Sequence, residues 1–130
     1  MNKEEFVEEL KKINIQITSF QLEQFDKYYK LLVDWNNKIN LTRITEKEDV
    51  YLKHFYDSLT ITKVIDLTKV NTLCDIGTGA GFPGVVLKIM YPNLKITLVD
   101  ALQKRVNYLN EIINELGLTD IEAIHVRGED

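Results

Sequence analysis

The chain contains 130 residues, 45% of them hydrophobic and 28% charged, with a net charge of −4 at pH 7. This length favours a single domain, the acidic balance lacks the basic excess typical of nucleic-acid binding, and no apolar run is long enough to span a membrane. The N-terminus carries no signal-peptide pattern and a single cysteine excludes an internal disulfide, so we expect a cytoplasmic protein.

The first 66 residues are predicted to form helices. Apolar residues recur at helical spacing over residues 6–13, between lysines and glutamates. A capping box at Thr18–Gln21 predicts the start of a longer helix, whose apolar stripe ends near residues 36–40. A second box at Thr45–Glu48 predicts another helix, and a further helical segment is expected to begin around residue 56.

His54 and Asp57 are three residues apart, which is one turn of that helical region. Two interpretations follow from this spacing. The two side chains form a partnered pair near a ligand cleft, or the histidine is a hydrogen-bonded structural residue.

From residue 67 onward, apolar runs of strand length alternate with helical patterns. The expected order is strand 72–76, a helix, strand 94–99, helix 103–116 and strand 121–126. This order predicts an α/β fold with a right-handed parallel half-sheet, so we divide the chain into a helical segment (1–66) and a β-α-β-α-β unit (67–130).

Two expectations concern the first of these strands. Cys74 lies within it and is expected to be buried and inert. Three parallel strands are few for such a sheet, so the first strand would be left as an exposed edge. We therefore expect further strands in a longer protein, or a homodimer formed through that edge.

A glycine-rich stretch, Asp75-Ile76-Gly77-Thr78-Gly79-Ala80-Gly81-Phe82-Pro83-Gly84, connects the first strand to the next helix. Such a loop lets a ligand lie against the backbone, and the N–H groups of the following helix attract anionic or polar atoms. Asp100 ends the next strand, where a carboxylate commonly binds the two hydroxyls of a ribose. The stretch therefore predicts a nucleotide-type ligand.

The glycines fit two motifs. Gly79, Gly81 and Gly84 match Gly-x-Gly-x-x-Gly, which is typical of dinucleotide sites. With Gly77 in place of Gly84, the pattern becomes Asp-x-Gly-x-Gly-x-Gly, whose acid, Asp75, is positioned to hold an ammonium group. S-adenosylmethionine has such an ammonium and a dinucleotide has none there, so the second motif favours a methyl donor.

Four stretches together resemble the bacterial RsmG (GidB) family over essentially the whole chain: Trp35–Thr42, Lys53–Leu59, Cys74–Gly84 and Val99–Arg105. The resemblance implies a Rossmann-like fold. It also implies an enzyme that transfers a methyl group from S-adenosylmethionine to guanine N7 of small-subunit (16S) ribosomal RNA. Members of the family are longer, so the chain resembles their N-terminal part.

The resemblance also implies a set of cofactor contacts. It puts Gly77 and Phe82 at the methionine end, Asp100, Ala101 and Leu102 at the ribose and the adjoining part of the adenosine, and Gly128 and Glu129 beside the adenine. Together with the motif, the expected cofactor-binding residues are Asp75, Gly77, Gly79, Gly81, Phe82, Asp100, Ala101, Leu102, Gly128 and Glu129.

No catalytic residue and no metal site are predicted. A sulfonium methyl is already electrophilic and guanine N7 offers a neutral lone pair, so the reaction needs positioning more than a base. Two alternatives stay open at this point: an NAD-dependent oxidoreductase, favoured by the dinucleotide motif, and a non-catalytic association module.

Overall fold

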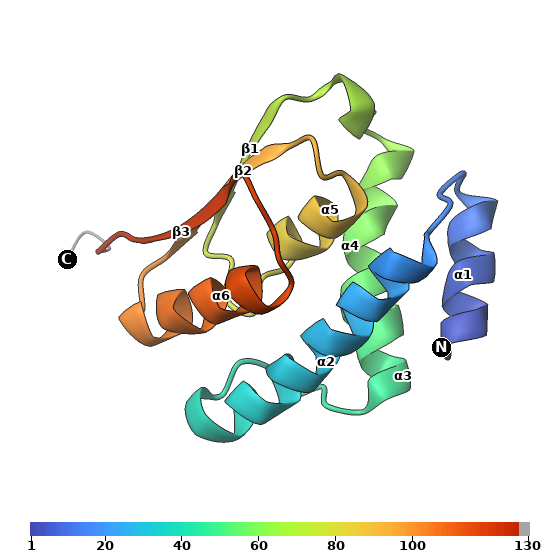
Figure 1. Cartoon of the computed structure of the whole chain (residues 1–130). Coiled ribbons are helices and arrows are strands. Elements are labelled where there is room, and N and C mark those ends of the chain that lie inside the picture. Colours follow the sequence, from blue (N-terminus) through green and yellow to red (C-terminus); the bar gives the residue numbers. More distant parts are fainter. Residues whose placement is uncertain (128–130) are drawn as a thin grey trace.

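The computed structural model of the chain describes residues 1–127, and Figure 1 shows the N-terminal helices packed beside a small sheet. Its helices are, in chain order, α1 (Lys3–Lys12), α2 (Ser19–Ile39), α3 (Lys47–Val50), η1 (Tyr51–Tyr56), α4 (Asp57–Leu59), η2 (Thr60–Lys63), η3 (Leu67–Lys69), α5 (Gly84–Met90) and α6 (Gln103–Glu115). Its strands are β1 (Thr72–Ile76), β2 (Lys95–Asp100) and β3 (Ile121–His125). The helical first part and the β-α-β-α-β order that follows it confirm the prediction.

Side chains cap the starts of the first two helices. Asn2 and Glu5 form a reciprocal capping box on α1, and Thr18 and Gln21 form the predicted box on α2. In the second box the Thr18 N–H donates to Gln21 Oε1 at 2.9 Å, and the Gln21 N–H donates to Thr18 Oγ1 at 3.1 Å. These bonds satisfy N–H groups that a first helical turn leaves without partners, so they fix where each helix begins.

The segment from Lys47 to Leu59 is helical throughout, and η1 is a π-helical turn between α3 and α4. The capping box predicted at Thr45–Glu48 is wrong, because the N-cap residue is Glu46 and its side chain makes no capping hydrogen bond. Thr45 lies one residue too early to act as the cap. The helical segment expected to begin near residue 56 is a continuation of this helix.

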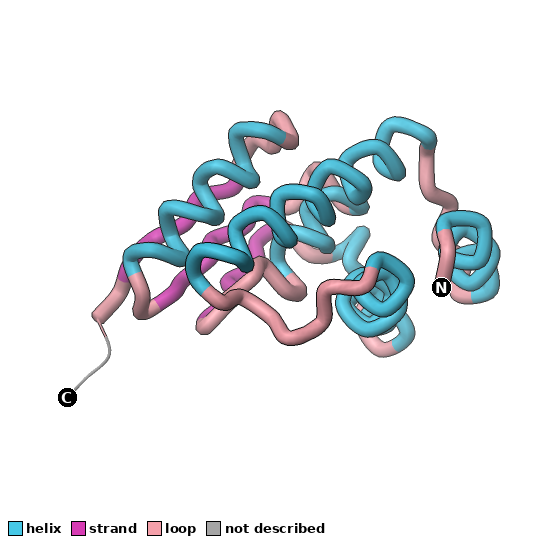
Figure 2. Tube along the Cα trace, turned by 90° about the horizontal axis from the view of Figure 1, so that it is seen from below, coloured by secondary structure: helices cyan, strands magenta, loops and turns pink. Residues whose placement is uncertain are grey.

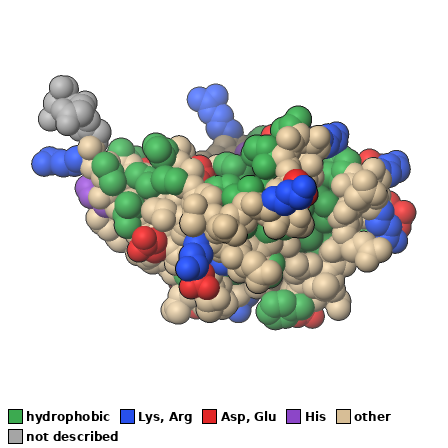
Figure 3. Space-filling model, turned by 90° about the horizontal axis from the view of Figure 1, so that it is seen from above, with side chains coloured by type: hydrophobic (Ala, Val, Ile, Leu, Met, Phe, Trp, Pro, Cys, Tyr) green, Lys and Arg blue, Asp and Glu red, His purple; other side chains and the backbone are tan. Residues whose placement is uncertain are grey.

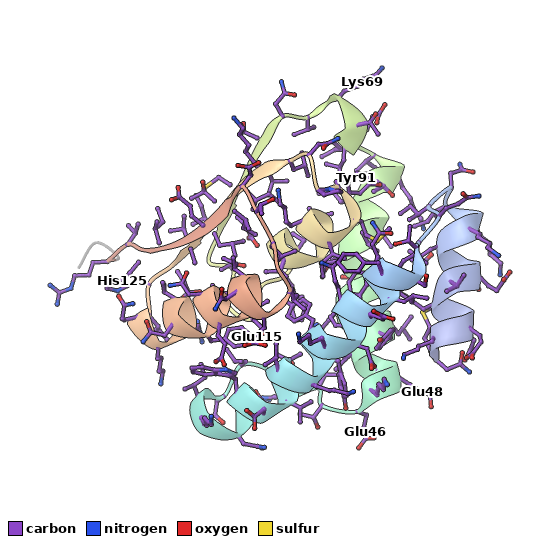
Figure 4. All side chains as sticks on the ribbon, in the orientation of Figure 1. Glu46, Glu48, Lys69, Tyr91, Glu115 and His125 are labelled. Carbon is purple, nitrogen blue, oxygen red and sulfur yellow. The ribbon has the colours of Figure 1, made fainter. Side chains whose placement is uncertain are left out.

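The strands are parallel and lie in the order β1-β2-β3. Asp100 of β2 pairs in register with His125 of β3, and both lie at the carboxyl ends of their strands. α5 and α6 cover the same face of the sheet, and α2 packs on these two helices as a third layer (Figures 1 and 2). At the end of α6, Glu115 points toward α2 (Figure 4), where its Oε2 lies 3.8 Å from Lys27 Nζ.

The opposite face of the sheet is open to solvent within the described chain. Thr72, Cys74 and Ile76 point to this face from β1, and Ile76 is 79% exposed. Cys74 was expected to be buried and is exposed, because strand alternation turns it away from the face that the helices cover. Figure 3 looks onto this side of the molecule, where hydrophobic side chains gather. β1 is an edge strand of the described sheet, as expected.

Aromatic side chains join the helical part to the α/β part. The Phe55 ring lies 4.9 Å from Phe25, 5.2 Å from Tyr28 and 5.1 Å from Tyr51, measured between centroids. On the side of the glycine loop, Phe82 lies 6.1 Å from the same ring. Buried residues of both parts form one hydrophobic cluster, so the two segments share a core.

Candidate functional site

The loop from Gly77 to Pro83 joins β1 to α5 at the carboxyl edge of the sheet. Gly77 and Gly79 have positive φ angles of 71° and 59°. The Gly77 N–H donates to the Val99 carbonyl at 2.8 Å, which ties the loop to β2. A Cβ on Gly77 or Gly79 would meet no atom within 4 Å, so the space beside the loop is open at both positions.

Two buried tyrosines hold the middle of this loop. The hydroxyls of Tyr28, from α2, and Tyr108, from α6, both donate to the Ala80 carbonyl, at 2.7 and 2.9 Å. Burial raises the pKa of both phenols above the ordinary value, so they remain protonated donors. A Cβ on Gly81 would collide with the Tyr28 hydroxyl, so the loop can approach this phenol only because residue 81 is glycine.

We expect Tyr28→Phe and Tyr108→Phe to be non-additive. Each single change leaves the Ala80 carbonyl one donor and should cost about 1 kcal/mol of unfolding free energy. The double variant leaves a buried carbonyl without a donor, so it should cost about 1 kcal/mol more than the two single changes combined. Urea unfolding of the four proteins measures the coupling, and strictly additive losses would contradict the shared-acceptor geometry.

Asp75 is the last residue but one of β1, and its side chain is turned toward α5. Its Oδ2 accepts the N–H of Gly84, the first residue of α5, at 2.9 Å. A Cβ on Gly84 would lie 2.8 Å from that oxygen, so this close contact also requires glycine. Pro83 is the N-cap residue of α5. Asp75 thus closes the turn between strand and helix, a role that its spacing in the sequence does not reveal.

Asp100 ends β2 and is only 3% exposed. Its Oδ2 accepts the Gly79 N–H at 2.9 Å, its Oδ1 accepts the Leu102 N–H at 3.0 Å, and Arg105 Nη1 lies 3.6 Å from Oδ1. The carboxylate therefore fastens the glycine loop to the start of α6. A carboxylate oxygen can accept two hydrogen bonds, so Oδ2 retains capacity for a ligand hydroxyl.

Ala101 and Leu102 are exposed at the same edge of the sheet, directly after β2. His125 lies at the end of β3 (Figure 4), and its Nε2 donates to the Ala101 carbonyl at 3.0 Å. The turns after β1 and β2 thus bring together eight of the predicted site residues: Asp75, Gly77, Gly79, Gly81, Phe82, Asp100, Ala101 and Leu102. The other two, Gly128 and Glu129, lie outside the described residues.

Phe82 packs against the helical part of the chain. His54 stacks on its ring, with centroids 4.4 Å apart and planes 13° from parallel. The His54 Nε2 lies 2.9 Å from Thr42 Oγ1, its hydrogen-bond partner. Burial lowers the pKa of His54, an effect that Asp57 partly opposes, so the ring is neutral at pH 7. Of the two interpretations of His54, the structure favours the hydrogen-bonded structural histidine.

The arrangement has the features of a site for a nucleoside-type ligand. Space is open beside Gly77 and Gly79, and Asp100 offers an acceptor at the edge where parallel α/β sheets bind nucleotides. Thr78 Oγ1 is buried and has no hydrogen-bond partner within residues 1–127. Buried polar atoms are rarely left without partners in folded proteins.

The family model described as "GidB: rRNA small subunit methyltransferase G" matches residues 21–130. The match includes the glycine loop, both acidic strand ends and the two tyrosines that hold the loop. The chain belongs to the GidB family. Its three parallel strands with helices on one face are consistent with a Rossmann-like methyltransferase fold, as the resemblance implied.

Curated relatives of this GidB chain carry the name ribosomal RNA small subunit methyltransferase G. The relative from Exiguobacterium sibiricum is 52% identical over 130 residues, which cover 100% of this chain and 55% of that protein. The Bacillus pumilus relative is 54% identical over 129 residues, 99% of this chain and 54% of that protein. The Leuconostoc mesenteroides relative is 55% identical over 132 residues, with coverages of 100% and 55%. The chain spans about half the length of the relatives it matches.

Sequence reasoning missed the two tyrosines. Tyr28 and Tyr108 lie on the apolar faces of α2 and α6, where the spacing predicts only burial. A buried tyrosine usually finds a hydrogen-bond acceptor, and this was the available signal.

Within residues 1–127, the structure contains no group of three or more His, Cys, Asp or Glu side chains placed to hold a metal ion. No helix in that part combines the length and apolar character needed to cross a membrane.

Proposed function

We propose that this chain forms the cofactor-binding part of a methyltransferase that transfers a methyl group from S-adenosylmethionine to guanine N7 of small-subunit (16S) ribosomal RNA. The observation that carries the proposal is the glycine loop tied to the Asp100 carboxylate at 2.9 Å, with open space beside Gly77 and Gly79. Family membership and the relatives' names support the reaction class and the RNA substrate.

In this proposal the two segments have separate tasks. Residues 67–130 supply the first half of the Rossmann-like domain. Residues 1–66 pack against it and support the loop through Tyr28, which donates to the Ala80 carbonyl and packs on the Phe82 ring. The residues that would hold the cofactor are Asp75 at the ammonium, Gly77 and Phe82 at the methionine end, Asp100, Ala101 and Leu102 at the ribose, Gly79 and Gly81 along the loop, and Gly128 and Glu129 at the adenine.

When bound, the cofactor supplies a sulfonium methyl group that is electrophilic without further activation. Guanine N7 is a neutral lone pair, so this chain's residues have no proton to remove before attack. Their task is to hold the two reactants in line at about 3–3.5 Å and to keep the glycine loop fixed while charge moves from sulfur to base. We therefore assign no catalytic residue.

The partners follow from the same proposal. The acceptor is ribosomal RNA or the small ribosomal subunit, which would also place the protein in the cytoplasm. Homodimer formation through the β1 edge stays a prediction. The relatives named above are methyltransferases, so the comparisons give the NAD-dependent alternative no support.

Titration calorimetry tests the cofactor site in the 130-residue chain. We expect saturable binding of S-adenosylmethionine and S-adenosylhomocysteine, and no heat with NAD. Asp100→Asn keeps the side-chain shape but removes the charge and an acceptor. It should therefore weaken the binding of S-adenosylhomocysteine at least tenfold, which is a loss of about 1.4 kcal/mol of binding free energy. The control is Asp34→Asn, an acid on α2 whose side chain is 67% exposed, which should leave the affinity unchanged.

Two results would contradict the proposal. Heat with NAD alone would assign the loop to a dinucleotide. A folded sample that binds none of the three ligands would show that the chain is not the cofactor-binding part.

A further inference from the structure

A shallow cleft of about 490 Å³ lies directly beside the glycine loop. Phe82 and Pro83, at the end of the loop, form one wall, and the segment from Asp57 to Val64 forms the other. The two walls are held together because α4 packs on α5 and the His54 ring stacks on Phe82. This cleft is distinct from the open space beside Gly77 and Gly79.

The polar side chains that line the cleft offer only hydrogen-bond acceptors. Ser58 Oγ donates its proton to the His54 carbonyl at 2.6 Å, and Thr60 Oγ1 donates to the Asp57 carbonyl at 2.6 Å. Both hydroxyls therefore face the cleft with lone pairs only. Asp57 is exposed, and none of the ion pairs within residues 1–127 includes its carboxylate.

The rest of the lining is apolar. Ile61, Val64, Phe82 and Pro83 complete it, and Val64 is 82% exposed. A ligand suited to this cleft has an apolar face and an edge rich in N–H donors, and it carries no negative charge at that edge. A phosphate is excluded from the position of Asp57 because like charges repel.

Guanine has this chemistry. Its N1–H and N2–H₂ groups lie side by side on the Watson–Crick edge, and a carboxylate can accept both at once. Adenine instead presents the N1 lone pair to the carboxylate, which is unfavourable. A guanine held by its Watson–Crick edge has N7 on the other side of the purine, where it is free to react.

We infer that the cleft between Asp57 and Phe82 is the acceptor-base subsite, and that Asp57 selects guanine by accepting from N1–H and N2–H₂. This inference rests on the proposed function, because it takes a guanine as the methyl acceptor. An acidic residue is unusual on a surface that binds RNA, because it repels phosphates. Hydrogen bonds from the Watson–Crick edge of an extruded base would explain why Asp57 is present there.

The test is a pair of NMR titrations of the ¹⁵N-labelled 130-residue chain with guanosine 5′-monophosphate and adenosine 5′-monophosphate. Each is done with and without saturating S-adenosylhomocysteine. We expect the guanine nucleotide to shift the amide signals of residues 57–61 and of Phe82, and the adenine nucleotide to bind at least tenfold more weakly. Asp57→Asn should remove this preference while the affinity for S-adenosylhomocysteine stays within twofold, and Asp34→Asn should change neither.

The outcomes separate the inference from the proposed function. Equal binding of the two nucleotides, shifts outside the cleft, or no shift with either nucleotide would overturn the inference. A tenfold loss of S-adenosylhomocysteine affinity in Asp57→Asn would assign the cleft to the cofactor and overturn it as well. Failure of the unmodified chain to bind S-adenosylhomocysteine, with the guanine shifts intact, would count against the proposed function alone.

Discussion

Replacing Gly81 with alanine should lower the free energy of unfolding by about 2–5 kcal/mol, from backbone strain and overpacking together. Residue 81 has φ of 101°, where a side chain is strained in any surroundings. The new methyl group would also collide with the Tyr28 hydroxyl and come 2.9 Å from Val85 Cγ2. To relieve these contacts, the loop must move off the two phenols that hold Ala80.

The same change should abolish S-adenosylhomocysteine binding under conditions in which the variant is still folded. Gly117→Ala is the matched control, because residue 117 also has a positive φ, 65°, but a Cβ there meets no atom within 4 Å. In the control, backbone strain alone should lower the free energy of unfolding by about 1–2 kcal/mol, and the affinity for S-adenosylhomocysteine should be unchanged. Urea unfolding and calorimetry on both variants make the comparison. A Gly81→Ala protein as stable as the Gly117→Ala protein would contradict the packing beneath the loop.

Phe55→Ala should lower the free energy of unfolding by about 3–5 kcal/mol, the usual loss when a buried phenylalanine is truncated to alanine and leaves a cavity. The Phe55 side chain is fully buried and contacts aromatic rings from α2, from η1 and from the glycine loop. A loss of this size is a large part of the total stability of an ordinary domain. Because the two segments share one core, far-UV and near-UV circular dichroism should report a single transition with the same midpoint.

Phe20→Ala on α2 is the control for this substitution. The Phe20 ring is 66% exposed, so removing it should change the free energy of unfolding by no more than about 0.5 kcal/mol. Two separate transitions in Phe55→Ala, one helical and one α/β, would show that residues 1–66 and 67–130 fold independently. A loss below 1 kcal/mol would contradict the shared aromatic core.

The sequence predicted most of the fold because its elements are marked by strong local signals. β1 has the predicted bounds, and β2, expected at residues 94–99, is found at Lys95–Asp100. The capping box at Thr18 and the positive φ of Gly117 mark helix ends by local chemistry alone. The box at Thr45 was wrong because composition does not decide between two adjacent N-cap positions.

The candidate site was predicted less completely, because a residue's position in a motif does not say where its side chain points. Asp75 and Asp100 were found from their places at strand ends, but their bonds to Gly84 and Gly79 depend on how helix and loop pack. Tyr28 and Tyr108 are far apart in the sequence and meet only at the Ala80 carbonyl. Such long-range contacts carry no periodic signal.

The open face of the sheet has a practical consequence for assembly experiments. Cys74 is the chain's single thiol and lies on that face, exposed to solvent. A maleimide reagent should therefore attach at one known position without any engineered cysteine. The rate of labelling then reports how exposed this face of the sheet is. A slower rate in a longer polypeptide, or at high protein concentration, would show that another segment or a second chain covers Cys74 on β1.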